Sequence, residues 1–255
     1  MENLIAWAAA GGWAEIGFIS LVFLLAGLVK GVTGMGLPTV AVALLSLRMA
    51  PMEAAALLIV PSALTNLWQL LAGGGVYPLW QRLWPVLFGI CAGTALVGVL
   101  VLSAKWTIGV LAAALFGYGL LGLSGLRWHV AATTERWLGP LTGVCTGLLS
   151  GASGVLVIPV VPYLQALDLE KDDLVQAMGM AFTASTLALA VVLAAHGDWQ
   201  PTAAGMSFLA VIPAACGMFL GQRLREVMRP ALFRRCFFVA LLLLGAYLGW
   251  QALWR

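Results

Sequence analysis

The sequence predicts an all-α polytopic membrane protein, and three observations carry that prediction. First, 62% of its 255 residues are hydrophobic and only 9% are charged, whereas a soluble domain carries about 25% charged residues. Second, apolar segments long enough to span a bilayer follow one another along the chain. Third, the first segment of each half is interrupted by glycine and proline, which break helices. We therefore expect one transmembrane domain over residues 1–255.

About eight hydrophobic segments follow in order along the chain. A spanning helix needs about 20 mainly apolar residues, and each segment reaches or approaches that length. The first and fifth are the longest, and each contains a Gly-rich break. The segments are 16–47, 54–72, 83–103, 106–126, 138–167, 174–195, 202–221 and 235–254.

The order of these segments repeats, with one interrupted and three continuous segments in each half. Residues 27–38 read GLVKGVTGMGLP, and residues 147–159 read GLLSGASGVLVIP, so three glycines recur at a constant offset. Downstream, Gly89-xxx-Gly93 resembles Gly217-xxx-Gly221, a spacing that lets two helices approach closely. We interpret the chain as two internal repeats over about 14–126 and 138–254.

Two topologies fit this repeat. The loop 222–235 contains five arginines, so it should be cytoplasmic. If each interrupted segment crosses once, the halves are parallel; if each is a re-entrant hairpin, the halves are inverted. A first half-segment over 16–29 would be only about 20 Å long as a helix, too short for a core of about 30 Å. That favours half-helices, and both topologies place the two termini outside.

Several functional classes lack a sequence signal. The four cysteines all lie inside apolar segments without metal or disulfide spacing, so we interpret them as small core residues. The N-terminus has no basic region before its apolar stretch, so we expect no cleaved signal peptide. No catalytic constellation, phosphate-binding loop or metal-ligand spacing is present. We expect no catalytic residue, no cofactor and no metal.

The two Gly-rich breaks predict a site for a small anion. Backbone interrupted at membrane depth survives only if protein buries it or it lines a polar cavity, and paired interruptions are typical of transporter substrate sites. Glycines let the backbone approach a ligand, and Lys30 supplies a charge. The predicted substrate-binding residues are Lys30, Gly31, Thr33, Gly34, Gly36, Asn66, Ser150, Gly151, Ser153, Gly154 and Ser185.

Structural alternatives remain open for these side chains. Lys30 could extend to a membrane interface instead of facing a substrate. Ser62, Thr65, Asn66 and Gln69 share one helical face, and Gln176, Thr183, Ser185 and Thr186 occupy the comparable region of the second half. Their hydroxyls could equally bond to backbone carbonyls or to neighbouring helices. A buried amide such as that of Asn66 needs several partners, which favours a role in a site.

These motifs resemble the sulfite exporter TauE/SafE family. The resemblance rests on the run from Lys30 to Gly36, its degenerate copy at Gly151–Gly154, and the two-half layout. It covers nearly the whole chain. The chain departs from the family where Val155, Leu156 and Val157 stand at positions often held by further glycines. The resemblance implies transport of small sulfur-containing anions such as sulfite, thiosulfate and organosulfonates.

The sequence therefore predicts export of small sulfur anions, including sulfite, sulfoacetate and sulfolactate. The mechanism would be that of a secondary transporter or uniporter, with the anion between the two broken helices near mid-membrane. An anion channel, an importer of thiosulfate or another small oxyanion, and an intramembrane enzyme remain alternatives. The expected partners are the small anion and the lipid bilayer of a bacterial inner membrane, without nucleic acid. A homodimer is left open.

Overall fold

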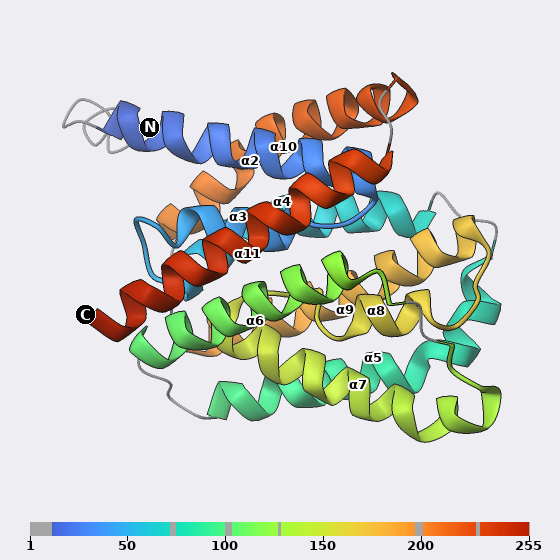
Figure 1. Ribbon diagram of the computed structural model, residues 1–255. Coiled ribbons are helices and arrows are strands. Elements are labelled where there is room, and N and C mark those ends of the chain that lie inside the picture. The colour runs from blue at the N-terminus through green and yellow to red at the C-terminus, as the bar shows by residue number, and fades with distance from the viewer. Residues whose placement is uncertain are drawn as a thin grey trace.

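The computed structural model describes residues 12–71, 75–99, 104–126, 129–196, 201–227 and 230–254. Within these ranges the chain forms α-helices and no β-strands (Figure 1). The helices are α2 Trp13–Thr33, α3 Leu37–Leu45, α4 Pro51–Leu71, α5 Val76–Val99, α6 Ala104–Ser124, α7 Ala132–Ser153, α8 Val160–Gln165, α9 Lys171–His196, α10 Pro201–Val227 and α11 Pro230–Trp254.

Seven of the described helices are long and apolar enough to cross a membrane. They are α2, α4, α5, α9, and the apolar parts of α6, α10 and α11. This confirms the predicted all-α polytopic class. α7 is more polar, with Glu135 in its first turn, while α3 and α8 have only nine and six residues. The count of eight hydrophobic segments stays a prediction.

The first helix differs from the one expected at the break. We expected a half-helix over 16–29, whereas α2 continues through Lys30 and Gly31 to Thr33. Its 21 residues give a length of about 32 Å, enough to cross the hydrocarbon core. Gly31 remains helical because α10 packs directly on it: a Cβ there would overlap the carbonyl oxygen of Met218.

Glycines join helices of opposite halves at two places. A Cβ at Gly27 would overlap the carbonyl oxygen of Ala214, so α2 and α10 touch through their backbones. In the same way α5 contacts α7, where Gly89 and Gly93 meet the backbone near Gly143 and Gly147. The close helix approach predicted for the small-residue pairs of α5 and α10 is confirmed.

Two pairs of helices run antiparallel, α4 with α9 and α6 with α11, and the predicted repeat would make each a pair of corresponding helices. Leu70 of α4 accepts a hydrogen bond from Gln176 near the start of α9, and Asn66, earlier on α4, reaches Thr186, later on α9. α6 and α11 also pair in opposite directions, because Gly119 meets Leu242 while Gly122 meets Phe238. This is the direction that inverted halves require. The duplication itself, with its boundaries 14–126 and 138–254, stays a prediction.

The α2–α3 and α7–α8 segments are each packed against a long helix of the other half. α2 runs parallel to α10, since Gly27 meets Ala214 and Gly31 meets Met218. The start of α2 and the end of α11 lie on the same side of the molecule (Figure 1). Between the two pairs, α4 and α9 contact each other, and both carry buried polar side chains, among them Asn66 and Thr186.

Candidate functional site: a buried lysine between α2, α4 and α9

The first break is a three-residue turn between α2 and α3. Gly34 ends α2 in the left-handed conformation (φ 78°), and its N–H donates to the carbonyl of Lys30 at 2.8 Å. Gly36 is also left-handed (φ 100°) and precedes α3. Glycine adopts this conformation without the steric cost of a Cβ. The Gln69 amide of α4 donates to the Gly34 carbonyl at 2.6 Å, which ties the turn to the next helix.

Lys30 lies on the last turns of α2, and its ammonium group points into the protein. Its side chain is 3% exposed. Nζ donates to Thr65 Oγ1 at 3.0 Å and to Asn66 Oδ1 at 2.5 Å, both on α4. The Asn66 amide nitrogen in turn donates to Thr186 of α9 at 3.4 Å. An extension of Lys30 to the membrane interface therefore does not describe this structure.

No carboxylate balances the charge of Lys30 among the described residues. The ion pairs found there are Arg82–Glu135 and His129–Asp168, and the other buried polar side chains are neutral. A buried charge without a counter-charge is costly even when it is hydrogen-bonded. An ammonium group has three N–H donors, and two of them are used by Thr65 and Asn66. The third can meet an anion.

Two buried hydroxyls without hydrogen-bond partners lie on α4 and α9. Ser62, one turn before Asn66 on α4, and Ser185, next to Thr186 on α9, are fully buried. Their oxygens have no hydrogen-bond partner in the described structure. Buried hydroxyls are nearly always paired in native proteins. They add unused buried donors to α4 and α9, the two helices that carry Asn66 and Thr186.

Three other predicted site hydroxyls are already used within the protein. Thr33 Oγ1 lies 2.8 Å from the carbonyl of Val29 and accepts from the N–H of Met35 at 3.2 Å. Ser153 repeats this arrangement at the second break, donating to Leu149 at 2.7 Å. Ser150 lies 3.1 Å from Thr94 of α5. These bonds hold the turns and helices, so the role of these three side chains in binding stays a prediction.

The second break has the same type of turn as the first, but its residues are buried. Gly154 ends α7 in the left-handed conformation (φ 73°), and its N–H donates to Ser150 at 2.8 Å. Behind it Val155, Leu156 and Val157 are completely buried. At the first break, in contrast, residues 33–35 are only partly buried. The departure from the Gly-rich pattern thus coincides with a packed, apolar segment.

The two breaks do not meet at one point. Gly34 is bonded to Gln69 near the end of α4, while a Cβ at Gly154 would lie 2.9 Å from Ala55 near the start of α4. Fourteen residues separate those contacts, which is about 21 Å along a helix. One small anion cannot touch both breaks. The predicted set therefore divides into a group near the first break, to which Lys30 and Asn66 belong, and the residues of the second break.

Close packing explains why glycine, and no larger residue, stands at most of the predicted glycine positions. Gly31 lies on the backbone of α10, and Gly151 lies against Val97 and Thr94 of α5. Beside Gly36, the nearest atoms belong to Val29 and Phe237. Only Gly34 has open space, since a methyl group added there would have Met178 Cε, at 3.9 Å, as its closest neighbour. Contact of these glycines with a substrate stays a prediction.

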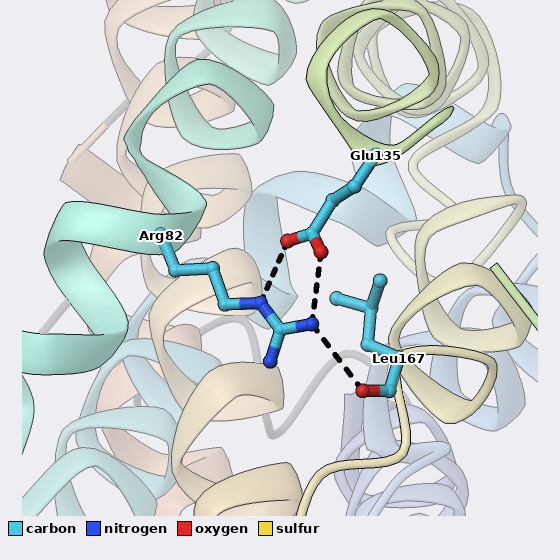
Figure 2. Close-up of polar contacts among 3 residues, drawn as sticks. All are labelled: Arg82, Glu135 and Leu167. Carbon is cyan, nitrogen blue, oxygen red and sulfur yellow. Dashed lines mark hydrogen bonds and ion pairs between the residues drawn. The ribbon is translucent and has the colours of Figure 1, made fainter. Parts of the chain in front are cut away.

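The α7–α8 segment has an additional anchor. Arg82 of α5 donates from two nitrogens to Glu135 of α7, at 2.7 and 2.8 Å, and to the carbonyl of Leu167 after α8 at 3.3 Å (Figure 2). One guanidinium thus joins three segments of the chain. In the α2–α3 segment, Arg48, after α3, lies 4.2 Å from the ring centre of Phe18 on α2.

Sequence reasoning identified the polar face of α4 but placed only Asn66 of its four members in the site. Gln69, also left out, donates to the carbonyl of Gly34. Thr65 contacts Lys30 directly, and Ser62 has an unused hydroxyl. The spacing of Ser62, Thr65, Asn66 and Gln69 was the available signal, because residues three or four apart share one helical face. What the spacing alone does not reveal is that Lys30 meets this face.

The comparison with protein families identifies the chain. The family model of the sulfite exporter TauE/SafE matches residues 19–248 of the 255. The chain belongs to this family. Neither the comparison with curated proteins nor that with solved structures gives a match. Membership makes this TauE/SafE protein an integral membrane protein of a family that transports sulfur anions such as sulfite.

Proposed function

We propose that this TauE/SafE protein exports small sulfur anions, such as sulfite or organosulfonates including sulfoacetate and sulfolactate, across a bacterial inner membrane. It acts as a secondary transporter or uniporter and has no catalytic activity. The anion binds between the two broken-helix segments, beside Lys30, Asn66, Ser62 and Ser185 on α2, α4 and α9. Assembly as a homodimer remains a separate prediction.

One observation carries this proposal: Lys30 is buried at 3% exposure without a carboxylate partner in the described structure. An anion that enters the membrane loses its water and needs donors in exchange. The free N–H of Lys30 and the unused hydroxyls of Ser62 and Ser185 would replace that water. Binding would also give the ammonium group its missing counter-charge.

The packing of α2 supports loading from the cytoplasm. The described end of α10 carries Arg223 and Arg225, and the first two turns of α11 carry Arg234 and Arg235, so this end is expected in the cytoplasm. α2 runs parallel to α10, which brings the partly exposed first break to the same end. The sealed second break would then close the outer side of the protein.

The membrane potential favours the outward direction. At about 100 mV, negative inside, entry of each negative charge costs about 2.3 kcal/mol. Uncoupled anion movement therefore runs outward, which suits an exporter.

Flux in proteoliposomes tests the function. Liposomes that contain the purified protein and are loaded with radiolabelled sulfite should release the label faster than equally loaded liposomes without protein. External unlabelled sulfite should accelerate the exchange, because a carrier shows counterflow and a channel does not. Equal release from liposomes with and without protein, for sulfite and for the sulfonates alike, would contradict the proposal.

A further inference from the structure

The hydroxyl of Tyr118 on α6 lies at the first break. It donates to Met35 Sδ at 3.2 Å, and Met35 is one of the partly exposed residues of the break. The ring of Tyr118 packs edge-on against Phe238 of α11, with 5.2 Å between the ring centroids. The neighbouring Phe237 would lie 3.4 Å from a Cβ added to Gly36. Helices α6 and α11, which pack against each other, thus contribute an aromatic wall to the first break.

The present acceptor of the Tyr118 hydroxyl is a weak one. A thioether sulfur accepts hydrogen bonds poorly, although a buried tyrosine O–H normally has a partner. The Tyr118 side chain is 3% exposed. An oxyanion is a much stronger acceptor, because the bond to it is charge-assisted. Since the methionine side chain is flexible, it can give up this donor when an anion arrives.

Arg234 supplies a positive charge to the same place. It precedes Phe237 and Phe238 by three and four residues on α11, so the three side chains share one face of the helix. Arg234 is exposed, and its guanidinium acts electrostatically on the Tyr118 hydroxyl. Positive charge at the mouth of a path raises the local concentration of anions. An anion that approaches the first break along this face of α11 therefore meets Arg234 before it reaches Tyr118.

Charges of both signs lie at this end of the protein. They are Arg223, Arg225 and Glu226 on α10 and Asp172 and Asp173 in the first turn of α9. Because these charges oppose one another, the net charge of this end does not by itself direct an anion to the break. The Tyr118 hydroxyl and the charge of Arg234 can do so, since both act at Met35.

We propose that Tyr118 and Arg234 form an entry site for the anion at the first break, separate from the contact with Lys30. Arg234 attracts the anion at the cytoplasmic end, and the Tyr118 O–H leaves Met35 and donates to the anion. The anion then passes to Lys30, which is buried one turn before Gly34 on α2. The entry site rests on the proposed function and adds one residue from α6 and one from α11 to the path of the same anion.

Sulfite efflux from proteoliposomes tests the entry site with two matched pairs of variants. Tyr118→Phe removes the O–H and keeps the ring, whereas Met35→Leu removes the sulfur and keeps the donor. Arg234→Gln and Arg235→Gln remove the same charge from positions about 100° apart around α11. For each variant, the KM and the maximal rate of sulfite release are measured at about 0.1 M and about 1 M salt, where the Debye lengths are about 10 Å and about 3 Å.

Tyr118→Phe should raise the KM for sulfite about tenfold or more, the loss expected for a hydrogen bond to a charged group, with a smaller change in maximal rate. Met35→Leu should leave the KM within about twofold or lower it, because the donor is then free for the anion. At the lower salt concentration, Arg234→Gln should raise the KM about threefold more than Arg235→Gln does. The higher salt concentration should reduce this difference, because it screens an exposed charge.

Three results would overturn the entry site while wild-type efflux is intact. A wild-type KM in Tyr118→Phe would show that the anion does not use this donor. Equal rises of the KM in Tyr118→Phe and Met35→Leu would show that their bond only holds the break. Equal effects of the two arginine variants would remove Arg234, which is exposed and therefore remains testable if Tyr118→Phe fails to fold. Wild-type efflux no faster than that of protein-free liposomes would overturn the proposed function and the entry site together.

Discussion

The two Gly-rich breaks have the same turn but different surroundings. At each, a left-handed glycine ends the helix and donates to the carbonyl four residues earlier, that of Lys30 or of Ser150. At each, the preceding hydroxyl, of Thr33 or Ser153, bonds back to the helix. The first break, however, carries a buried cation and is partly exposed, whereas the second is neutral and completely buried.

This difference distinguishes the features that form the turn from the feature that can bind an anion. Features common to both breaks, the left-handed glycine and the bonded hydroxyl, are what a helix end needs in order to turn within the membrane. The feature present at only one break, Lys30, is what an anion needs. The α7–α8 segment that contains the second break has a further anchor, because Arg82 bonds Glu135 at the start of α7 and the carbonyl of Leu167 after α8 (Figure 2). We therefore expect the first break to serve binding and the second to act as a structural seal.

The largest effect is expected from alanine at the two left-handed glycines. Alanine in this conformation costs about 1–2 kcal/mol at either position. At Gly154 the added methyl group would also lie 2.9 Å from Ala55, whereas at Gly34 the nearest atom is 3.9 Å away. Overpacking adds about 1–3 kcal/mol. Gly154→Ala should thus give less folded protein and a lower unfolding temperature than Gly34→Ala, as measured by size-exclusion chromatography and thermal unfolding.

Equal losses of folded protein and of stability in Gly34→Ala and Gly154→Ala would contradict the predicted difference between the two breaks. They would indicate that the tight packing around Gly154 relaxes at no cost, so that the second break is no more rigid than the first.

A carboxylate beside Lys30 should weaken anion binding strongly. Asn66→Asp places a negative charge at the atom that now accepts from Lys30 Nζ, so the cation gains an internal partner and no longer attracts a substrate. We expect sulfite affinity to fall by about 1.5–3 kcal/mol, or roughly ten- to a hundredfold. The measurement is a sulfite titration of the purified variant.

Asn66→Ser is the matched control for this change, because it removes the amide without adding a charge. It should lose less affinity than Asn66→Asp does. If both variants bind sulfite as the parent protein does, the anion does not lie beside Lys30.

The smallest effect is expected at the paired hydroxyls. Thr33→Ala and Ser153→Ala each remove a bond to the helix backbone, which is worth about 1 kcal/mol. Both variants should lose similar stability and keep their sulfite dissociation constants within about twofold. A tenfold loss of affinity in Thr33→Ala alone would add Thr33 to the binding site and sharpen the contrast between the breaks.

The sequence predicted the features that depend on local pattern. The apolar lengths indicated the spanning helices, and the spacing of Gly89 and Gly93 indicated a close helix contact. The recurrence of Gly34 and Gly154 marked two turns that prove to share left-handed geometry. Each of these signals lies within a few residues of the feature that it predicts.

Features that depend on distant packing were less accessible. The end of α2 at Thr33 was misplaced, because only the fold brings the backbone of α10 against Gly31. For the same reason, the sequence could not show that the breaks lie near opposite ends of α4. A serine or threonine bonded to its own helix, such as Ser153, looks the same in sequence as one with a free hydroxyl, such as Ser185.

The most direct test of the central claim compares the two matched positions, Lys30 and Ser150. Sulfite dissociation constants are measured by calorimetry on purified, monodisperse wild type, Lys30→Ala and Ser150→Ala at one ionic strength. If Lys30 compensates the anion, Lys30→Ala weakens binding about ten- to a hundredfold, while Ser150→Ala stays within about twofold of wild type. Wild-type affinity in a folded Lys30→Ala protein would contradict the account.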